Sequence, residues 1–204
     1  MVEVSELVPD VSRETMERLK LYEKLLRKWN PRINLVSKNT LDALWDRHFI
    51  DSAQLWTIAN EGQHWADLGS GGGFPGLVIA TIAAELRPNM TVTLVESDSR
   101  KATFLRSAAR EMGISPKIYV ERIESLPPLG ADILSARALA PLTQLCAYAE
   151  RHLSTNGYTV FPKGEKAVDE IKTALASWRF QVESFPSKTD ANASILKLEG
   201  ISRA

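Results

Sequence analysis

The chain has 204 residues, of which 44% are hydrophobic, and it carries 25 basic and 25 acidic side chains. This length suits one domain with a small extension, and no apolar run reaches the roughly 18 residues that a membrane-spanning helix needs. Cys146 is the only cysteine, which excludes an internal disulfide and a zinc cluster built from cysteines. The first residues lack the basic and apolar regions of a secretory signal, so we expect a soluble, cytoplasmic protein without a membrane anchor.

The zero net charge hides a basic segment. Residues 13–47 contain nine basic and five acidic side chains. A phosphate backbone could bind to such a segment. The alternative is a solvated helix face whose charges pair with one another, as Glu17 with Lys20 and Glu23 with Arg27 would. The residues alone leave both interpretations open.

Two amphipathic helices are predicted before residue 62. Ser12 can cap the first, which we expect to end at Asn30-Pro31. Its apolar positions recur every three or four residues and are Met16, Leu19, Tyr22, Leu26 and Trp29. Thr40 is expected to open the second helix, which carries His48 among its apolar positions and closes near residues 60–62. Each helix has a narrow apolar stripe, so both should pack against the rest of the chain.

After residue 62 short apolar runs alternate with helical patterns. Strands are predicted at residues 64–68, 91–96, 117–121, 131–136 and 158–161, and helices at 76–86, 99–112, 141–153 and 165–177. Residues 180–185 and 194–198 can form a hairpin that completes the sheet. This alternation predicts an α/β fold with a doubly wound, mostly parallel seven-stranded sheet. We expect a single domain over residues 1–204, with a helical extension at 1–61 and the core at 62–204.

A glycine-rich loop follows the first predicted strand. Residues 67–76 read DLGSGGGFPG, and Glu96 ends the next predicted strand. Glycines between a strand and a helix let the backbone approach a ligand closely, and an acid after the next strand can bind ribose hydroxyls. This pattern predicts a nucleotide-type cofactor site.

The loop alone leaves the identity of the cofactor open. Residues 71–76 also match the G-x-G-x-x-G fingerprint of dinucleotide sites, but such a match is weak. Asp67 stands two residues before Gly69, and the glycines then alternate through Gly71 and Gly73. An acid at this place suits a cationic ligand, and S-adenosylmethionine carries a sulfonium and an amino group but no phosphate. No Gly-Lys-Ser or Gly-Lys-Thr follows, which excludes a phosphate loop of nucleotide triphosphatases. A tight turn without a ligand is the remaining alternative.

Basic side chains follow several of the predicted strands. Arg137 comes after the strand at 131–136, at the sheet edge where open α/β sheets bind ligands, and Lys163 belongs to the same rim. Arg137 can hold a carboxylate, a phosphate or a base. Arg100 and Lys101 open the helix after Glu96 and are candidates for contacts with phosphate groups. Ordinary rim charges, or a solvated helix start, are the alternatives.

Five motifs in this order resemble those of the RsmG (GidB) family, bacterial methyltransferases of small-subunit ribosomal RNA. They are LRKWNPRINLVS at residues 26–37, RHFIDS at 47–52, DLGSGGGFPG at 67–76, SARA at 135–138 and Lys163-Gly164. The resemblance covers nearly the whole chain. It implies a class I S-adenosylmethionine-dependent methyltransferase fold, which is Rossmann-like with helices on both faces of the sheet. It also implies methyl transfer to N7 of one guanosine in the decoding region of 16S rRNA.

The resemblance also implies the site residues. The residues expected to bind the cofactor are Asp67, Gly69, Gly71, Phe74, Glu96, Ile123, Glu124 and Arg137, with Glu96 at the ribose and Ile123 and Glu124 at the adenine. The residues expected to position the reacting groups are Arg137, Lys163 and His48. The residues expected to contact RNA are Arg32, Arg47, Asp51, Arg100, Lys101 and Lys163.

The expected chemistry needs few specialised groups. Guanine N7 has a lone pair and no hydrogen, so no general base is required and the enzyme mainly provides placement and electrostatics. His48 is therefore expected to position rather than to remove a proton. In a helix, Arg47 and Asp51 would share a face at i and i+4, so an intrahelical ion pair beside a core histidine is the alternative interpretation of this motif.

The expected partner is 16S rRNA, in the 30S subunit or its precursor, and we expect a monomer without a metal site. Three rival functions remain open. A methyltransferase of another RNA or a small molecule would share every cofactor residue. A non-catalytic RNA-binding module would bind RNA without methyl transfer, and a nicotinamide-dependent reductase would bind NADH.

Overall fold

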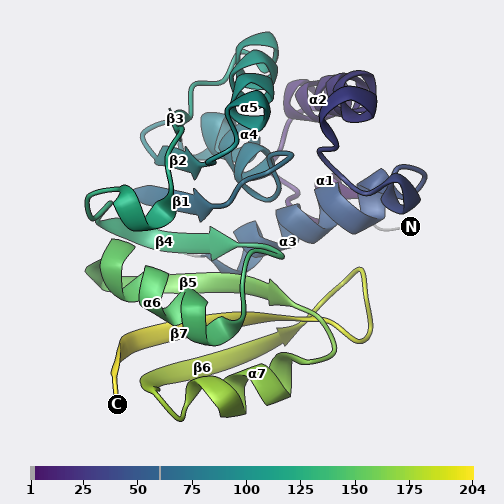
Figure 1. The fold of residues 1–204 in the computed structure, drawn as a ribbon. Helices are drawn as coiled ribbons and strands as arrows, with labels where there is room; N and C mark the ends of the chain where they lie inside the picture. Colours follow the sequence, from purple (N-terminus) through teal and green to yellow (C-terminus); the bar gives the residue numbers. More distant parts are fainter. Residues whose placement is uncertain (1–2, 60) are drawn as a thin grey trace.

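A single seven-stranded sheet organises the molecule (Figure 1). The structure, a computed structural model, describes residues 3–59 and 61–204. The strands are β1 (His64–Leu68), β2 (Thr91–Val95), β3 (Lys117–Tyr119), β4 (Ala131–Ala136), β5 (Leu153–Lys163), β6 (Trp178–Pro186) and β7 (Ser194–Arg203). Their order in the sheet is β3-β2-β1-β4-β5-β7-β6, and only the pairs that include β7 are antiparallel. The predicted mostly parallel sheet with a terminal hairpin is confirmed.

Helices cover both faces of this sheet because successive strand residues point to opposite sides. Ile133 packs in a core cluster with residues of α4 (Gly76–Leu86) and α5 (Ser99–Met112). The next residue, Leu134, packs in a second cluster with residues of α6 (Leu142–His152) and α7 (Ala167–Ala174). The carboxyl ends of β1, β4 and β5 therefore meet at one edge between two helical layers, and this edge is where ligands bind in such folds.

The amino-terminal extension differs from the two predicted helices. It consists of α1 (Val4–Leu7), α2 (Arg13–Ile33), the 3₁₀ turn η1 (Lys38–Thr40), the π-helix η2 (Trp45–Ile50) and α3 (Asp51–Ile58). The prediction that one helix begins at Thr40 is wrong, because a 3₁₀ turn, a π-helix and a short α-helix replace it. Part of the predicted end at residues 60–62 lies outside the described residues.

The end of α2 also differs from the prediction. Pro31 lies inside the helix, which continues to Ile33. Proline removes one helical donor, but this loss is tolerated near the end of a helix that is otherwise anchored. Asn34 caps the helix in the left-handed region with φ of 49°. The Asn30 side chain then accepts hydrogen bonds from the backbone nitrogens of Leu35 and Val36, at 2.7 and 2.9 Å.

The extension is packed into the main core. Leu19 and Leu26 of α2 and Phe49 of η2 are fully buried in the same cluster as Leu77 of α4 and Leu94 of β2. Other boundaries differ from the predictions by a few residues. For example, β5 begins at Leu153 and α7 ends at Ala174.

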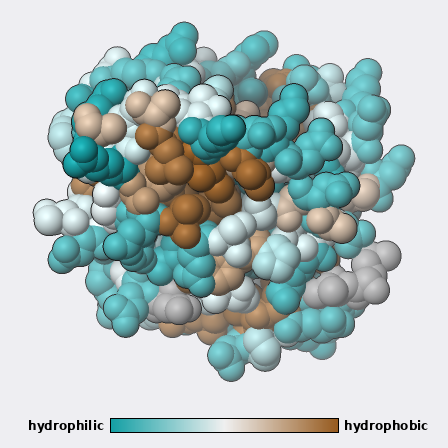
Figure 2. Space-filling model, turned by 90° about the horizontal axis from the view of Figure 1, so that it is seen from below, coloured by the Kyte–Doolittle hydropathy of each residue, from teal (hydrophilic) through white to brown (hydrophobic). Residues whose placement is uncertain are grey.

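One face of the molecule carries exposed apolar side chains. From below, where Figure 1 places α7 and β6, apolar residues gather at the surface (Figure 2). Val168 of α7, Leu175 at its end and Val182 of β6 are exposed by 76, 50 and 41%. Within the described residues, no helix is both long enough and apolar enough to cross a membrane.

Candidate functional site

Two adjoining cavities lie at the carboxyl ends of the strands. The larger, of about 900 Å³, is lined by the glycine loop (residues 67–76), by η2, by the segment after β4 and by the connection between β6 and β7 (residues 187–193). The smaller, of about 300 Å³, is lined by residues that include Glu96, Ile123 and Glu124. Gly69, Gly71, Lys101 and Arg137 line both. The structure thus brings most of the site residues predicted from the sequence to one place.

The glycine loop adopts a conformation that only glycines take readily. Gly69, Gly71 and Gly73 have φ of 67, 54 and 97°. A Cβ at Gly76 would meet Asp67 Oδ2 at 2.7 Å and a Leu94 methyl group at 2.1 Å. By contrast, a Cβ at Gly71 would meet only the Gly69 oxygen, at 3.8 Å, so the loop is open on its cavity side.

Asp67 lies beneath the loop and is fully buried. Its Oδ1 accepts from the Ser135 hydroxyl at 2.7 Å and its Oδ2 accepts from the Gly76 nitrogen at 3.2 Å. Burial raises the pKa of Asp67 to about 6, although the hydrogen bond from Ser135 acts in the opposite direction. This carboxylate lines neither cavity and supports the turn from beneath, and its contact with a cofactor stays a prediction.

Tyr22 holds the glycine loop from the amino-terminal extension. Its hydroxyl donates to the Gly72 carbonyl oxygen, and its ring stacks on Phe74 with 5.1 Å between centroids. Tyr22 has no exposed surface, and burial raises its pKa well above the ordinary value. The extension is therefore part of the structure that shapes the loop.

Glu96 joins the loop to the smaller cavity. Its Oε2 accepts from the Gly71 nitrogen at 2.8 Å and its Oε1 accepts from the Asp98 nitrogen at 2.7 Å. Its exposed fraction is 7%. Each oxygen keeps a second lone pair, so the carboxylate can support the loop and still accept hydrogen bonds from a ligand.

Ile123 and Glu124 form the far wall of the smaller cavity, in the 3₁₀ turn η3 (Ile123–Ser125). Ile123 is buried, with its carbonyl oxygen 3.0 Å from His152 Nε2. The Tyr148 hydroxyl donates to Glu124 Oε1 at 2.5 Å, and this bond lowers the pKa of Glu124. The wall thus offers an apolar side chain beside an ionised carboxylate.

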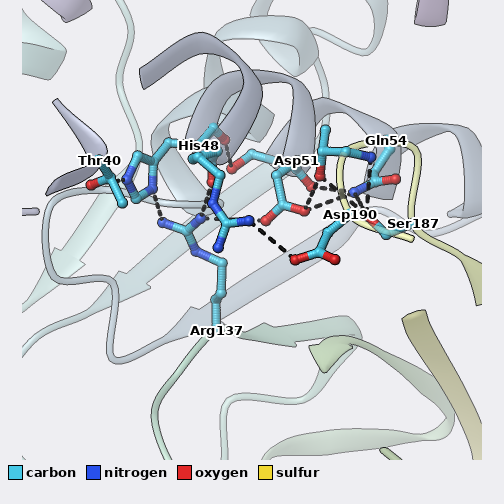
Figure 3. Close-up of polar contacts among 10 residues, drawn as sticks. Thr40, His48, Asp51, Gln54, Arg137, Ser187 and Asp190 are labelled. Atoms are coloured by element: carbon cyan, nitrogen blue, oxygen red, sulfur yellow. Dashed lines mark hydrogen bonds and ion pairs between the residues drawn. The ribbon is translucent and has the colours of Figure 1, made fainter. Parts of the chain in front are cut away.

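Arg137 donates to three acceptors in η2 and α3 (Figure 3). Its Nη1 lies 3.0 Å from the Arg47 carbonyl oxygen and 3.3 Å from Asp51 Oδ2, and its Nη2 lies 2.7 Å from His48 Nδ1. The guanidinium carbon also stands 5.3 Å from the centroid of the Phe74 ring. His48, Asp51 and Arg137, three of the site residues predicted from the sequence, are therefore in direct contact.

His48 is neutral and held at both ring nitrogens. Because Arg137 donates to Nδ1, the ring proton is on Nε2, which donates to the Thr40 hydroxyl oxygen at 2.9 Å. Burial, followed by the Arg137 and Arg47 cations, lowers the pKa of His48 to about 3. The ring lies 4.9 Å from the Phe74 ring and lines the larger cavity.

Arg47 and Asp51 do not form the intrahelical ion pair that their spacing allows. Arg47 instead contacts Asp190 in the β6–β7 connection, with 3.1 Å between Nη1 and Oδ2, and Asp51 pairs with Arg137. Arg47 lies in the π-helix η2, whereas Asp51 is the first residue of α3. The ion pair of the alternative interpretation is therefore wrong, whereas its core histidine agrees with a His48 side chain that is 9% exposed and bonded at both ring nitrogens.

Lys163 is engaged by its neighbours. Its ammonium donates to the Ala140 carbonyl oxygen at 2.9 Å and to Glu170 Oε2 at 2.8 Å, and its side chain is only 9% exposed. The same Glu170 oxygen accepts from the Leu142 nitrogen. Lys163 lines the larger cavity, and its bond to the Ala140 carbonyl oxygen holds the segment after β4 in place.

The remaining basic residues predicted to contact RNA occupy different positions. Lys101 lines both cavities. Arg100 is exposed and pairs with Asp98, with 3.2 Å between Nη2 and Oδ2. Arg32 is exposed near the end of α2 and lines neither cavity.

Several residues of the site were not predicted as such. Tyr22 was expected only as a core residue, and Thr40 only as a helix start. Gln54, Tyr148 and Thr189 were not singled out. Helical spacing places Tyr22 on a buried stripe, but it cannot show that the hydroxyl reaches the glycine loop. No local signal connects Thr189 with Asp51, because they lie 138 positions apart.

The strand order, the glycine loop after β1 and the acid after β2 define the fold of the class I S-adenosylmethionine-dependent methyltransferases. A solved structure described as a mutant of MtNAS in complex with S-adenosylmethionine has a TM-score of 0.58 at 18% identity, covering 90% of this chain and 75% of that chain. A T. thermophilus 16S rRNA methyltransferase, RsmC, in complex with AdoMet and guanosine has a TM-score of 0.53 at 15% identity, covering 76% and 38%. At these identities the likeness shows the fold alone.

The chain belongs to the GidB family, described as rRNA small subunit methyltransferase G, whose profile matches residues 15–196. A relative named ribosomal RNA small subunit methyltransferase G from Ruegeria pomeroyi is 54% identical over 202 residues, covering 97% of this chain and 99% of the relative. Another with the same name, from Ruegeria sp. strain TM1040, is 51% identical over 194 residues, covering 95% of each chain. These findings confirm the family predicted from the motifs, and with it an enzyme that transfers methyl groups.

Proposed function

We propose that the chain transfers a methyl group from S-adenosylmethionine to N7 of a guanosine in the decoding region of 16S rRNA. The observation that carries this proposal is the pair of adjoining cavities in a chain about half identical to ribosomal RNA small subunit methyltransferases G. The smaller cavity is lined by Glu96, Ile123 and Glu124, which suit a nucleoside, and the larger cavity has room for a base.

The residues fit the cofactor. Glu96 is a nearly buried acid beside the glycine loop, as ribose hydroxyls require, and the Ile123 side chain can cover an adenine ring. Glu124 can accept from the exocyclic amine. The open face of Gly71 lets backbone groups approach the ligand. Asp67 supports this arrangement from beneath.

When bound, the cofactor supplies a methyl group on a sulfonium, and guanine N7 accepts it without losing a proton. Positive charge then moves from the sulfur to the base. A neutral His48 adds no charge beside the base, and the Asp51 carboxylate balances the Arg137 guanidinium. These residues place the base and set the local field, which is the main work of such an enzyme.

Incubation with tritiated S-adenosylmethionine tests the proposal. We expect label in 16S rRNA of 30S particles from cells that lack this protein, and more than in naked 16S RNA. Reverse-transcription stops after N7-specific cleavage should map to one guanosine. Bound cofactor without label in any RNA would contradict the enzyme assignment, and label at another atom or on a small molecule would contradict the acceptor.

We further propose that the chain acts as a monomer in the cytoplasm, the compartment of its proposed ribosomal substrate. Light scattering after size exclusion should then give a mass near 22.7 kDa. A doubled mass would contradict the monomer, and the exposed apolar side chains of α7 and β6 would be the first contact surface to examine.

A further inference from the structure

We propose that the β6–β7 connection belongs to the active site: Thr189 and Gln54 fix the Asp51 carboxylate, and Asp51 holds Arg137 in its orientation beside the glycine loop. This inference rests on the proposed function, in which Arg137 faces the reacting groups. Asp51, Gln54 and Thr189 are positioning residues, because they act through Arg137.

The ion pair between Arg137 and Asp51 is mostly buried. The two side chains are exposed by 18 and 17%. Water and salt screen such a pair less than they screen a pair on the open surface, so its geometry influences the local field. Among the described residues, Asp51 is the carboxylate that pairs with Arg137, whereas the other acceptors of this guanidinium are the neutral His48 ring and the Arg47 carbonyl.

The outer oxygen of Asp51 is fixed by two donors. Oδ1 accepts from Gln54 Nε2 at 2.9 Å and from the Thr189 hydroxyl at 3.1 Å, while Oδ2 faces Arg137 (Figure 3). Without these donors the carboxylate would be free to turn, and a buried oxygen would lose its partners. The orientation of the oxygen that meets Arg137 therefore depends on groups behind Asp51.

A closed turn supplies Thr189. The Ser187 nitrogen donates to the Ala193 carbonyl oxygen at 3.0 Å, and the Thr189 nitrogen donates to the Ser187 hydroxyl oxygen at 3.2 Å. Gln54 is 1% exposed, and its Oε1 accepts from the Lys188 nitrogen at 2.8 Å. Gln54 thus contacts both Asp51 and the turn, which fixes the distance between α3 and the hairpin.

The Asp51 carboxylate has a chemical role beside Arg137. Methyl transfer places positive charge on the base, and an Arg137 without a balancing carboxylate would oppose that charge. Asp51 neutralises the guanidinium, and its fixed orientation keeps Arg137 against His48. The carboxyl-terminal hairpin therefore contributes to catalysis from a part of the chain that follows the methyltransferase motifs.

Side-chain variants test the inference. Thr189→Val removes a donor to Asp51 and keeps the shape of the side chain. Gln54→Leu removes the other donor, together with the oxygen that accepts from the Lys188 nitrogen. Thr173→Val on α7 is the matched control, because its hydroxyl donates to the Asp169 carbonyl oxygen in its own helix. We expect each site variant to lower the single-turnover rate about tenfold, the effect of losing a hydrogen bond to a charged group, with the cofactor dissociation constant unchanged. Thr189→Ser should restore the rate.

A second readout does not require activity. In the wild type, ¹⁵N NMR of the His48 ring should show Nδ1 as the acceptor from Arg137 and Nε2 as protonated. Thr189→Val and Gln54→Leu should shift the Nδ1 resonance, whereas Thr173→Val should not. Unchanged rates with unchanged His48 resonances would overturn the inference, as would a rate that Thr189→Ser does not restore. If wild-type protein labels no RNA, the proposed function fails, and the NMR comparison still decides whether these residues position Arg137.

Discussion

Glu96 has both carboxylate oxygens bonded to backbone nitrogens, yet it lines the smaller cavity. Its proposed role at the ribose adds ligand bonds to these two protein bonds. Loss of the carboxylate would then affect both the loop and the ligand. Among single residues, a substitution of Glu96 is therefore the most direct test of the proposed cofactor site.

Glu96→Ala should weaken S-adenosylmethionine binding about tenfold to a hundredfold, because hydrogen bonds to charged groups contribute roughly 1.5–3 kcal/mol. Calorimetric titration measures the dissociation constant. Glu96→Gln is the matched variant because it keeps the size of the side chain. Its amide nitrogen is a donor and would face one of the two backbone nitrogens, of Gly71 and Asp98, that donate to Glu96 in the wild type. Because Glu96 also supports the loop, Glu96→Ala should weaken the binding of an analogue without ribose hydroxyls less than it weakens the binding of S-adenosylmethionine. An equal loss of affinity for both ligands would contradict the ribose contact.

His48 and Asp67 should affect stability in opposite directions as pH falls. The pKa of His48 is lowered from 6.5 to about 3, so the unfolded chain takes up a proton first and stability is lost as pH falls from 6.5 towards 3. The pKa of Asp67 is raised from 3.8 to about 6, so the folded protein takes up the proton first and gains stability as pH falls from 6 to 3.8. At pH 5 the loss from His48 is about 2 kcal/mol and the gain from Asp67 is about 1 kcal/mol, so the two partly cancel.

Urea unfolding at pH 7 and pH 5 separates these contributions. Compared with the wild type, His48→Gln should lose less stability on acidification, and Asp67→Asn should lose more. Equal pH dependence in the wild type and His48→Gln would show that the folded protein does not hold His48 neutral. Because methyl transfer to N7 needs no general base, the transfer rate itself should stay flat from pH 6 to 8.

At the scale of elements, α2 and η2 bring the amino-terminal extension into the site. Trp29 and Tyr22 of α2 contact Phe104 of α5, and η2 delivers His48 and the Arg47 carbonyl oxygen to Arg137. Arg47 of η2 pairs with Asp190, and Asp51 at the start of α3 pairs with Arg137. An extension that looks separate in the sequence therefore contributes to the walls of the larger cavity.

Tyr22→Phe tests this connection. The change keeps the ring contacts but leaves the buried Gly72 carbonyl oxygen without its donor, which costs about 1–3 kcal/mol. We expect a lower free energy of unfolding and a several-fold weaker affinity for S-adenosylmethionine, because the loop loses a fixed point. Tyr119→Phe is the control, since Tyr119 is 38% exposed. An unchanged cofactor affinity in Tyr22→Phe would show that α2 does not set the loop conformation.

At the scale of the whole molecule, one core joins the extension and the sheet. Leu19, Phe49, Leu77 and Ile133 belong to a single buried cluster that spans α2, η2, α4 and β4. No element of the extension buries its apolar face by itself. On the basis of this shared packing we propose that residues 1–204 form a single domain.

Thermal unfolding should therefore be a single transition. Tryptophan fluorescence and far-ultraviolet circular dichroism should give the same midpoint, and S-adenosylmethionine should raise both equally by mass action. Cutting the chain between the extension and β1 should leave neither part folded. An early transition limited to the extension would indicate two domains.

The sequence by itself determined the class of fold and the family, and most of the residues that it predicts for the cofactor line the two cavities. Strands and helices alternate with periodicities that depend only on local burial, and the glycine loop and Glu96 lie close enough in sequence to form one recognisable unit. The tertiary structure decided how the side chains pair. Asp67 faces inward to Ser135 and Gly76, Arg47 meets Asp190, and Asp51 connects Arg137 with Thr189. These contacts join residues from different elements. Local patterns do not encode such long-range geometry, because it arises only when the hairpin, the extension and the strand ends pack around the same cavity.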